Sequence, residues 1–291
     1  MDFFDLLANS QAFLISTLFF LGLIIGSFLN VVIHRLPIML EREWGRDCRD
    51  FLQLPDDDQI NGPYNLLRPA SSCPSCGHKI RAWENIPVIS WLMLRGRCSA
   101  CQAKISARYP IIELITGLFS AWMAWHFGYG LVLLGSLLFI WLLISMTVID
   151  LDRQLLPDLL TLSGLWIGLL FNLEGTFTDL RSAVIGAIAG YMGLWIIVQL
   201  HKTLTGRQGM GNGDFKLLAM LGAWMGWQAL PGIILLSSVV GAVVGIAIIV
   251  LRRQDRQTPI PFGPYLAGAG LIYLLWGKDL TQAYLQMSGL A

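Results

Sequence analysis

The sequence predicts an all-α polytopic membrane protein with about eight transmembrane helices and a small loop domain between the first two of them. Three observations predict this class. Hydrophobic residues account for 55% of the 291 residues and charged residues for only 13%, whereas about a quarter of the residues in a soluble domain are charged. Long apolar runs recur along the chain, and one long polar segment interrupts them.

The first apolar run extends from Gln11 to Ile33. It follows Asp2 and Asp5 rather than a basic stretch, and it exceeds the apolar length of a cleavable signal peptide. We therefore expect a retained transmembrane helix, and residues 1–33 form the first of three predicted parts of the chain.

Seven further apolar or nearly uncharged runs follow the polar segment, and several are shorter than the ~20 residues of a comfortable span. They cover residues 109–127, 130–150, 158–173, 182–200, 215–230, 232–251 and 262–277. With the first run they give eight spans, seven spans being the alternative, and they make residues 109–291 the predicted transmembrane core. Tryptophans in this core, Trp224 among them, are expected to anchor spans at the membrane interface.

Basic residues are distributed unevenly over the loops between these runs. Residues 34–108 hold eleven of the twenty Lys and Arg residues, and eight alternating spans place eighteen on that same side, with only Arg181 and Lys278 opposite. The short loops alone give seven against two. Because cytoplasmic loops carry an excess of Lys and Arg, we expect residues 34–108 to face the cytoplasm and both termini to face the other side. The net charge of +1 gives no indication of a nucleic-acid partner.

The predicted cytoplasmic domain contains two pairs of cysteines, Cys73 with Cys76 and Cys98 with Cys101. Each pair continues in the same pattern, C-x-x-C-x-x-K-I, which makes a small internal repeat. Four thiolates are the usual shell of a structural zinc ion, so we expect a zinc-ribbon-like site with a folding role and no catalytic water. Two disulfides are the alternative, which a reducing cytoplasm disfavours. The fifth cysteine, Cys48, is expected to be a free thiol.

A charged carboxylate in or beside an apolar run costs free energy when the run enters a membrane. The carboxylates found at such positions are therefore candidates for functional residues. Glu113, Asp150, Asp152 and Asp214 fall in this class. The predicted topology puts Asp150 and Asp214 at cytoplasmic helix ends. Paired carboxylates suit the hydrolysis of a peptide bond, because one stays protonated while the other deprotonates water. In the alternative, Asp214 caps the following helix and Asp150 is an interfacial charge. The residues alone also leave Asp152 and Asp158 open as members of the pair.

Glycines occupy positions 209, 211 and 213, directly before Asp214. No buried strand is predicted before them, so a dinucleotide-binding loop is disfavoured. We expect them to provide a backbone that approaches its neighbours closely and lets Asp214 meet an extended substrate.

Six segments, in order along the chain, carry a resemblance to a known family. They are GSFLNVVIHRLP at 26–37, the paired C-x-x-C loop, ARYPIIELITG at 107–117, DLDRQLLPD at 150–158, GNGDFKL at 211–217 and PFGP at 261–264. On these segments the chain resembles the type IV prepilin peptidases, bifunctional aspartic enzymes of the GxGD group of membrane proteases.

The resemblance implies a bacterial inner-membrane endopeptidase whose catalytic pair is Asp150 and Asp214. It implies that the substrates are prepilins and type II secretion pseudopilins, whose short basic leader is removed on the cytoplasmic side of the lipid bilayer. The four-cysteine loop implies a second activity, N-methylation of the new amino terminus with S-adenosylmethionine as donor. The family architecture places this activity in residues 34–108 and the neighbouring spans.

Glu113 has several interpretations. A structural buried polar role comes first, before a side chain that faces the aspartate pair, orders a substrate amine or binds the methyl donor. Two other classes of protein are alternatives to a protease. A proton-coupled transporter requires ionisable groups near the middle of the membrane and two related halves of the chain, and the sequence shows neither. A membrane scaffold requires that both aspartates be dispensable.

Overall fold

The computed structural model of the chain describes residues 2–55, 64–206, 210–252 and 261–287. The chain divides into two compact units, Met1–Leu133 and Leu134–Ala291. The described part of the chain is helical, with two isolated β-bridges as its only extended pairing. Gly209 and three of the basic residues that support the predicted topology lie outside the described residues: Arg207, Arg253 and Arg256.

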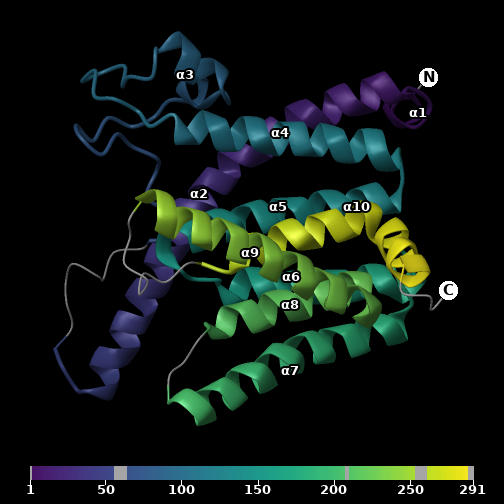
Figure 1. Ribbon diagram of the computed structural model, residues 1–291. Helices are drawn as coiled ribbons and strands as arrows, with labels where there is room; N and C mark the ends of the chain where they lie inside the picture. The colour runs from purple at the N-terminus through teal and green to yellow at the C-terminus, as the bar shows by residue number, and fades with distance from the viewer. Residues whose placement is uncertain (1, 56–63, 207–209, 253–260, 288–291) are drawn as a thin grey trace. The chain divides into compact units, whose positions relative to one another are not determined.

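The first unit consists of two long helices, three short helical segments and a long loop (Figure 1). Its helical segments are α1 (Phe3–Asn9), α2 (Gln11–Phe51), the 3-10 turn η1 (Ala82–Asn85), α3 (Ile89–Met93) and α4 (Arg108–Phe127). The segment between α2 and α4 carries the paired cysteines.

α2 begins where the sequence predicts, at Gln11, because the Ser10 side chain accepts a backbone hydrogen bond from the first turn. The apolar run ends at Ile33, but the helix continues through Pro37 and residues 38–51. These last residues include Leu, Met, Glu and Arg, which favour helix whether or not they are buried. The predicted boundary at residue 33 therefore marks the end of the apolar part of α2 rather than the end of the helix.

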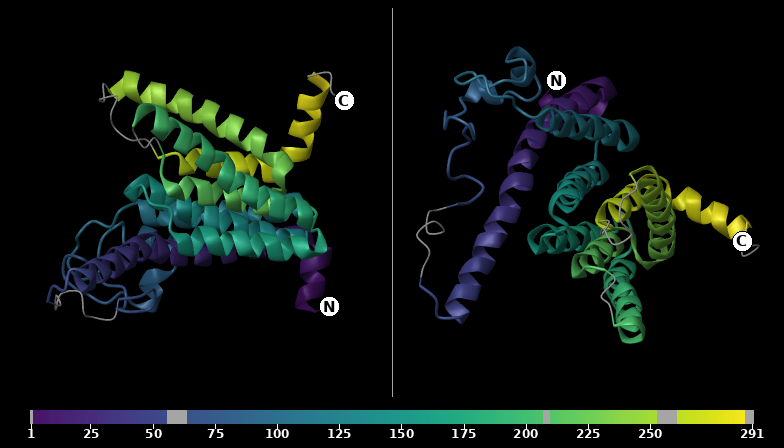
Figure 2. Two further views of the ribbon diagram at one scale, coloured as in Figure 1. Left: turned by 90° about the horizontal axis from the view of Figure 1, so that it is seen from below. Right: turned by 60° about the vertical axis from the view of Figure 1, so that its left-hand side comes forward.

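Small residues allow α2 and α4 to pack closely along each other (Figure 2). A Cβ on Gly22 would lie 2.5 Å from Ser120 Oγ, and one on Gly26 would lie 2.7 Å from Glu113 Cα. Larger side chains would force the helices apart, and glycines four residues apart commonly bring membrane helices together in this way. Asn30 Nδ2 adds a hydrogen bond of 3.1 Å to a carbonyl oxygen in the first turn of α4.

In its described residues the second unit contains two 3-10 turns, five whole helices and the part of α5 from Leu134 onward. They are α5 (Leu131–Arg153), α6 (Asp158–Phe171), η2 (Asn172–Glu174), α7 (Leu180–Thr205), α8 (Asn212–Met225), η3 (Trp227–Ala229), α9 (Leu230–Arg252) and α10 (Gly263–Met287). α8 lies beside α6 and α7, and α10 contacts both α8 and α9 (Figure 1). α8 is therefore the central helix of this unit.

Trp224 lies in the core that α8 forms with its neighbours. Its side chain is fully buried, and its Nε1 donates to Gly164 O (2.8 Å). Its ring packs against the rings of Phe139, Phe171 and Phe177. The prediction that Trp224 anchors a span at the membrane interface is wrong, because its indole is enclosed by the core of the unit.

The predicted run 215–230 does not form one continuous helix. α8 ends at Met225 because Gly226 has φ +82°, a conformation that residues other than glycine rarely adopt. The turn η3 then leads into α9.

Each of the eight predicted runs contains a helix, but these helices differ in length. Among the described residues, four segments are long and apolar enough to cross a membrane: Gln11–Phe51, Leu131–Arg153, Leu180–Thr205 and Trp227–Ile248. α6 and α8 have 14 residues each, fewer than the ~20 of a straightforward span. The chain is thus an all-helical membrane protein, and the count of eight spans stays a prediction.

Candidate functional site

Asp150 lies in the last turn of α5, and only 5% of the residue is exposed. Its Oδ2 accepts a hydrogen bond of 3.1 Å from the backbone N–H of Gly263, the first residue of α10. The N–H groups at a helix N-terminus stabilise negative charge. The structure therefore supplies Asp150 with a donor that favours its ionised form.

Asp214 is the third residue of α8 and is 8% exposed. α8 begins at Asn212 after Gly211, which has no capping side chain. In the alternative interpretation, Asp214 caps a helix that begins after it. The observed helix begins two residues before Asp214, so Asp214 is not its N-cap residue. Asp214 lies inside the first turn, and its carboxylate faces the backbone of Gly211.

Leu156 connects the surroundings of the two aspartates. It lies in the segment between α5 and α6 and is 7% exposed. A Cβ on Gly213 would be 2.8 Å from Leu156 Cβ. A Cβ on Gly263 would be 3.3 Å from Leu156 Cδ1 and 2.5 Å from Asp150 Oδ2. The starts of α8 and α10 thus converge on one leucine, and Asp150 and Asp214 are close enough for their charges to repel.

The other two aspartates of this segment have different surroundings. Asp158, the first residue of α6, has a side chain that is 59% exposed and that forms an ion pair with Lys216 Nζ, 2.6 Å from Oδ1. Asp152 is exposed in the last turn of α5. Among these aspartates the structure therefore pairs Asp150, and neither Asp152 nor Asp158, with Asp214 as a buried neighbour.

The sequence pattern alone does not identify Gly263 or Leu156 as part of this site. The one sequence feature that could point to Gly263 is the segment PFGP, which contains it. The structure gives the reason for a glycine there, because a larger residue at position 263 would clash with the Asp150 carboxylate. Gly213 meets the expectation of a close backbone approach. Gly211 does not need to be glycine on conformational grounds, because its φ of −76° is open to any residue.

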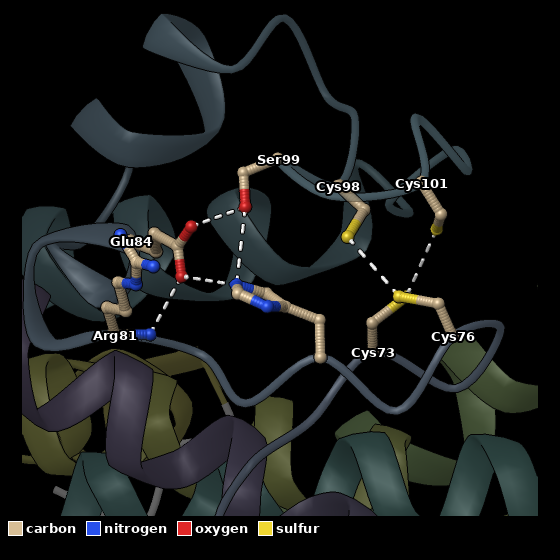
Figure 3. A network of polar contacts seen from close by, with 8 residues as sticks. Cys73, Cys76, Arg81, Glu84, Cys98, Ser99 and Cys101 are labelled. Carbon is tan, nitrogen blue, oxygen red and sulfur yellow. Dashed lines mark hydrogen bonds and ion pairs between the residues drawn. The ribbon is translucent and has the colours of Figure 1, made fainter.

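The four paired cysteines of the first unit converge on one point (Figure 3). Their sulfur atoms all lie within 4.8 Å of one another. Cys73 Sγ is 3.8 Å from Cys101 Sγ, and Cys76 Sγ is 4.0 Å from Cys98 Sγ. These separations exceed the ~2.05 Å of a disulfide bond, and the cysteines are free thiols. A tetrahedral shell with metal–sulfur distances of ~2.3 Å requires sulfur atoms about 3.8 Å apart. The donor set therefore fits one tetrahedral ion.

The two halves of the cysteine repeat fold alike. In each half the backbone N–H of the first cysteine donates to the carbonyl oxygen five residues later, at 2.9 Å. An isolated β-bridge then closes each hairpin. The residue after the second cysteine has a positive φ in both halves, +71° at Gly77 and +61° at Gln102. The repeat predicted from the pattern C-x-x-C-x-x-K-I is thus a structural repeat as well.

A polar network joins the two hairpins beside the sulfur cluster (Figure 3). Ser99 Oγ donates to Glu84 Oε1 (2.5 Å), and the backbone N–H of Arg81 donates to Glu84 Oε2 (2.7 Å). His78 Nε2 lies 3.4 Å from both Glu84 Oε2 and Ser99 Oγ. The Arg81 N–H, followed by the Ser99 hydroxyl, holds the pKa of Glu84 below its usual range. Glu84 therefore stays ionised at neutral pH and links the hairpin of His78 to that of Ser99.

Hydrogen bonds also favour the thiolate form of Cys73. The backbone N–H groups of Ser75 and Cys76 lower the pKa of Cys73 to about 6. Against a lowering backbone contact from His78, the neighbouring sulfur atoms, that of Cys101 first, raise the pKa of Cys76 to about 12. A metal binds the thiolate and not the thiol, so binding of an ion at the four cysteines would release the proton that Cys76 keeps at neutral pH.

Glu113 lies in α4 and is 8% exposed. Its Oε2 accepts a hydrogen bond of 2.7 Å from the backbone N–H of Val88, which precedes α3. This contact supports the interpretation of Glu113 as a buried polar group with a structural role.

Comparison with known proteins matches both units to peptidase families. Residues 20–127 match the bacterial peptidase A24 N-terminal domain, and residues 137–246 match the type IV leader peptidase family. No solved structure matches the chain.

Three curated relatives, each named prepilin leader peptidase/N-methyltransferase, cover nearly the whole chain. The relative from Aeromonas hydrophila is 59% identical over 271 residues, 93% of each chain. The relative from Stutzerimonas stutzeri is 55% identical over 285 residues, 98% of each chain, and that from Pseudomonas aeruginosa is 54% identical over 291 residues, 99% of each chain. Because more than half of the aligned residues are identical to those of relatives that cover 93% or more of both chains, the chain belongs to the type IV leader peptidase family.

Proposed function

We propose that the chain removes the leader peptide of type IV prepilins and type II secretion pseudopilins and then N-methylates the new terminal residue with S-adenosylmethionine. The name of the relatives supports both activities. The observation that carries the hydrolytic activity is the buried pair of Asp150 and Asp214 around Leu156.

In the proposed mechanism Asp150, which accepts a hydrogen bond from the Gly263 N–H, carries the negative charge, and Asp214, whose ionised form is disfavoured by the charge on Asp150, carries the proton. Asp150 takes a proton from a water molecule, whose oxygen attacks the carbonyl carbon of the scissile peptide bond. Asp214 donates its proton to the carbonyl oxygen at the same time. The tetrahedral intermediate collapses when Asp150 passes its proton to the leaving nitrogen and Asp214 recovers the hydroxyl proton. No covalent acyl-enzyme forms, so inhibitors of serine proteases should have no effect.

Gly263→Ala should lower the rate of leader cleavage by about a hundredfold or more. The added Cβ would lie 2.5 Å from Asp150 Oδ2, so the carboxylate must move away from its backbone donor. Gly268→Ala is the matched control, since a Cβ at that position of α10 meets nothing within 4 Å. Cleavage is measured with a purified prepilin in detergent. Equal rates for the two variants would show that the contact between Gly263 and Asp150 does not matter for hydrolysis.

Zinc is the metal that we propose for the four paired cysteines, with a folding role. Four thiolates close the tetrahedral shell and leave no position for a reactive water. When bound, the ion would hold together the two hairpins of Cys73 and Cys98, which are built from mostly exposed residues.

The proposed organisation assigns the two activities to different parts of the chain. Residues 1–33 form the first transmembrane helix, residues 34–108 form a cytoplasmic domain that takes part in methyl transfer, and residues 109–291 form the peptidase core. The excess of Lys and Arg in residues 34–108 supports a cytoplasmic position for this domain at the bacterial inner membrane.

Mass spectrometry of one substrate tests both activities. With S-adenosylmethionine present, the purified enzyme should convert a prepilin into a pilin that lacks its leader and carries one methyl group on its terminal nitrogen. Without S-adenosylmethionine, the same leader should be removed and no methyl group added. A prepilin that stays intact, or one that is cut within its apolar helix, would refute the proposed function.

A further inference from the structure

The backbone at Val88 adopts a conformation that valine disfavours. Its φ and ψ are +61° and −49°, and the N–H of Ile89 donates to Pro87 O at 2.6 Å, which closes a three-residue γ-turn. γ-turns with positive φ are rare and strained, and a β-branched residue with positive φ is an outlier. Such strain persists only where the surrounding structure holds it in place.

Glu113 supplies a contact that holds this turn. Its Oε2 accepts the Val88 N–H at 2.7 Å, a short hydrogen bond inside a largely buried site. The carboxylate stands on a rigid support, because Gly26 of α2 packs directly against the backbone of Glu113. The Ser27 hydroxyl of α2 also faces the carboxylate.

The turn leads into the second half of the cysteine repeat through a short series of contacts. Val88 precedes α3, and Trp91 in α3 donates from Nε1 to Ile105 O (3.2 Å). Ile105 N donates to Gly96 O (2.8 Å), which joins the two ends of the hairpin that contains Cys98. A change of direction at Val88 would therefore move the hairpin of Cys98 relative to α4.

We infer that Glu113 is a positioning residue for methyl transfer, which it serves by holding the strained turn at Val88 and thereby orienting the hairpin of Cys98. The inference rests on the proposed function, because it takes the cysteine domain to participate in methyl transfer. Glu113 acts through the backbone of Val88 and need not touch substrate or methyl donor. A neutral oxygen acceptor at position 113 is therefore sufficient for its role.

Substitutions at position 113 provide the first test. Glu113→Ala should lower the rate of methyl transfer to a precleaved pilin about tenfold, while leader cleavage of a prepilin stays at the wild-type rate. Glu113→Gln should retain most of the methyl transfer, because its amide oxygen still accepts the Val88 N–H. Glu43→Ala, which removes an exposed carboxylate from α2, is the control and should match the wild type in both reactions. Wild-type methyl transfer by Glu113→Ala would overturn the inference.

A second substitution distinguishes the proposed role from a general loss of packing. Glycine adopts positive φ without strain, so Val88→Gly should restore most of the methyl transfer to the Glu113→Ala protein. A cavity left by Glu113, or a lost contact with the methyl donor, would not be repaired by removing the Val88 side chain. Failure of Val88→Gly to restore methyl transfer would therefore also overturn the inference.

Hydrogen exchange separates this inference from the proposed function. In Glu113→Ala, residues 86–97 should exchange their amide hydrogens about tenfold faster than in the wild type, and adding Val88→Gly should reverse the change. If the wild-type protein transfers no methyl group at all, the proposed function fails, and exchange still decides whether Glu113 holds the turn. Unchanged exchange in Glu113→Ala would show that it does not.

Discussion

Asp150→Asn and Asp214→Asn should each lower the rate of leader cleavage by about a hundredfold or more, while methylation of a precleaved pilin continues. An amide has nearly the volume of the buried carboxylate that it replaces, but it can neither take a proton from water nor donate one to the carbonyl oxygen. The two carboxylates act as a unit, so the double variant should be little slower than either single variant. Rates are measured with purified proteins and a prepilin in detergent.

Asp158→Asn is the control for these two variants. It also replaces an aspartate by an amide, but at a side chain that is 59% exposed and paired with Lys216. An exposed ion pair contributes at most ~1 kcal/mol, so cleavage and methylation should stay near wild type. Wild-type cleavage by either Asp150→Asn or Asp214→Asn would exclude the proposed pair and require another source of proton transfer.

Substitution of any one of the four paired cysteines by alanine should remove the bound zinc and abolish methyl transfer. Three thiolates leave the tetrahedral shell open, and the two hairpins share no large apolar core that would hold them without the ion. The purified wild-type protein should contain one zinc ion per chain by elemental analysis. The variants should contain close to none, and residues 72–105 should become sensitive to limited proteolysis.

Cys48→Ala is the matched control, because Cys48 is an exposed free thiol outside the sulfur cluster. It should keep the wild-type zinc content and the wild-type rate of methyl transfer. Full zinc content in a Cys98→Ala protein would show that the four sulfur atoms do not bind the ion together.

Features that repeat or that follow hydropathy could be predicted from the sequence. The pattern C-x-x-C-x-x-K-I occurs twice, and the structure turns each copy into the same hairpin. Each apolar run contains a helix, because twenty or so apolar residues have few other ways to satisfy their backbone groups in a membrane. Asp150 and Asp214 were identifiable as candidates because charge beside apolar runs is rare, although spacing alone did not exclude Asp152 and Asp158.

Features that depend on contacts between distant segments could not be predicted in this way. The Gly263 N–H reaches Asp150 across 113 positions of sequence, and no local pattern encodes that distance. The Val88 turn looks unfavourable from local preference alone, and it is held by a carboxylate 25 positions later. Trp224 was expected at the membrane interface because hydropathy does not reveal that three phenylalanine rings enclose it.

The hydrogen bond from Gly263 to Asp150 has a consequence for the smallest fragment that retains hydrolytic activity. The match to the type IV leader peptidase family ends at residue 246, so a fragment cut at that boundary keeps both aspartates. It would lack α10, and with it the only backbone donor seen on the Asp150 carboxylate within the described residues. The proposed catalytic site is therefore built from three segments: the end of α5, the start of α8 and the start of α10. α10 belongs to this site although it contributes no reacting side chain.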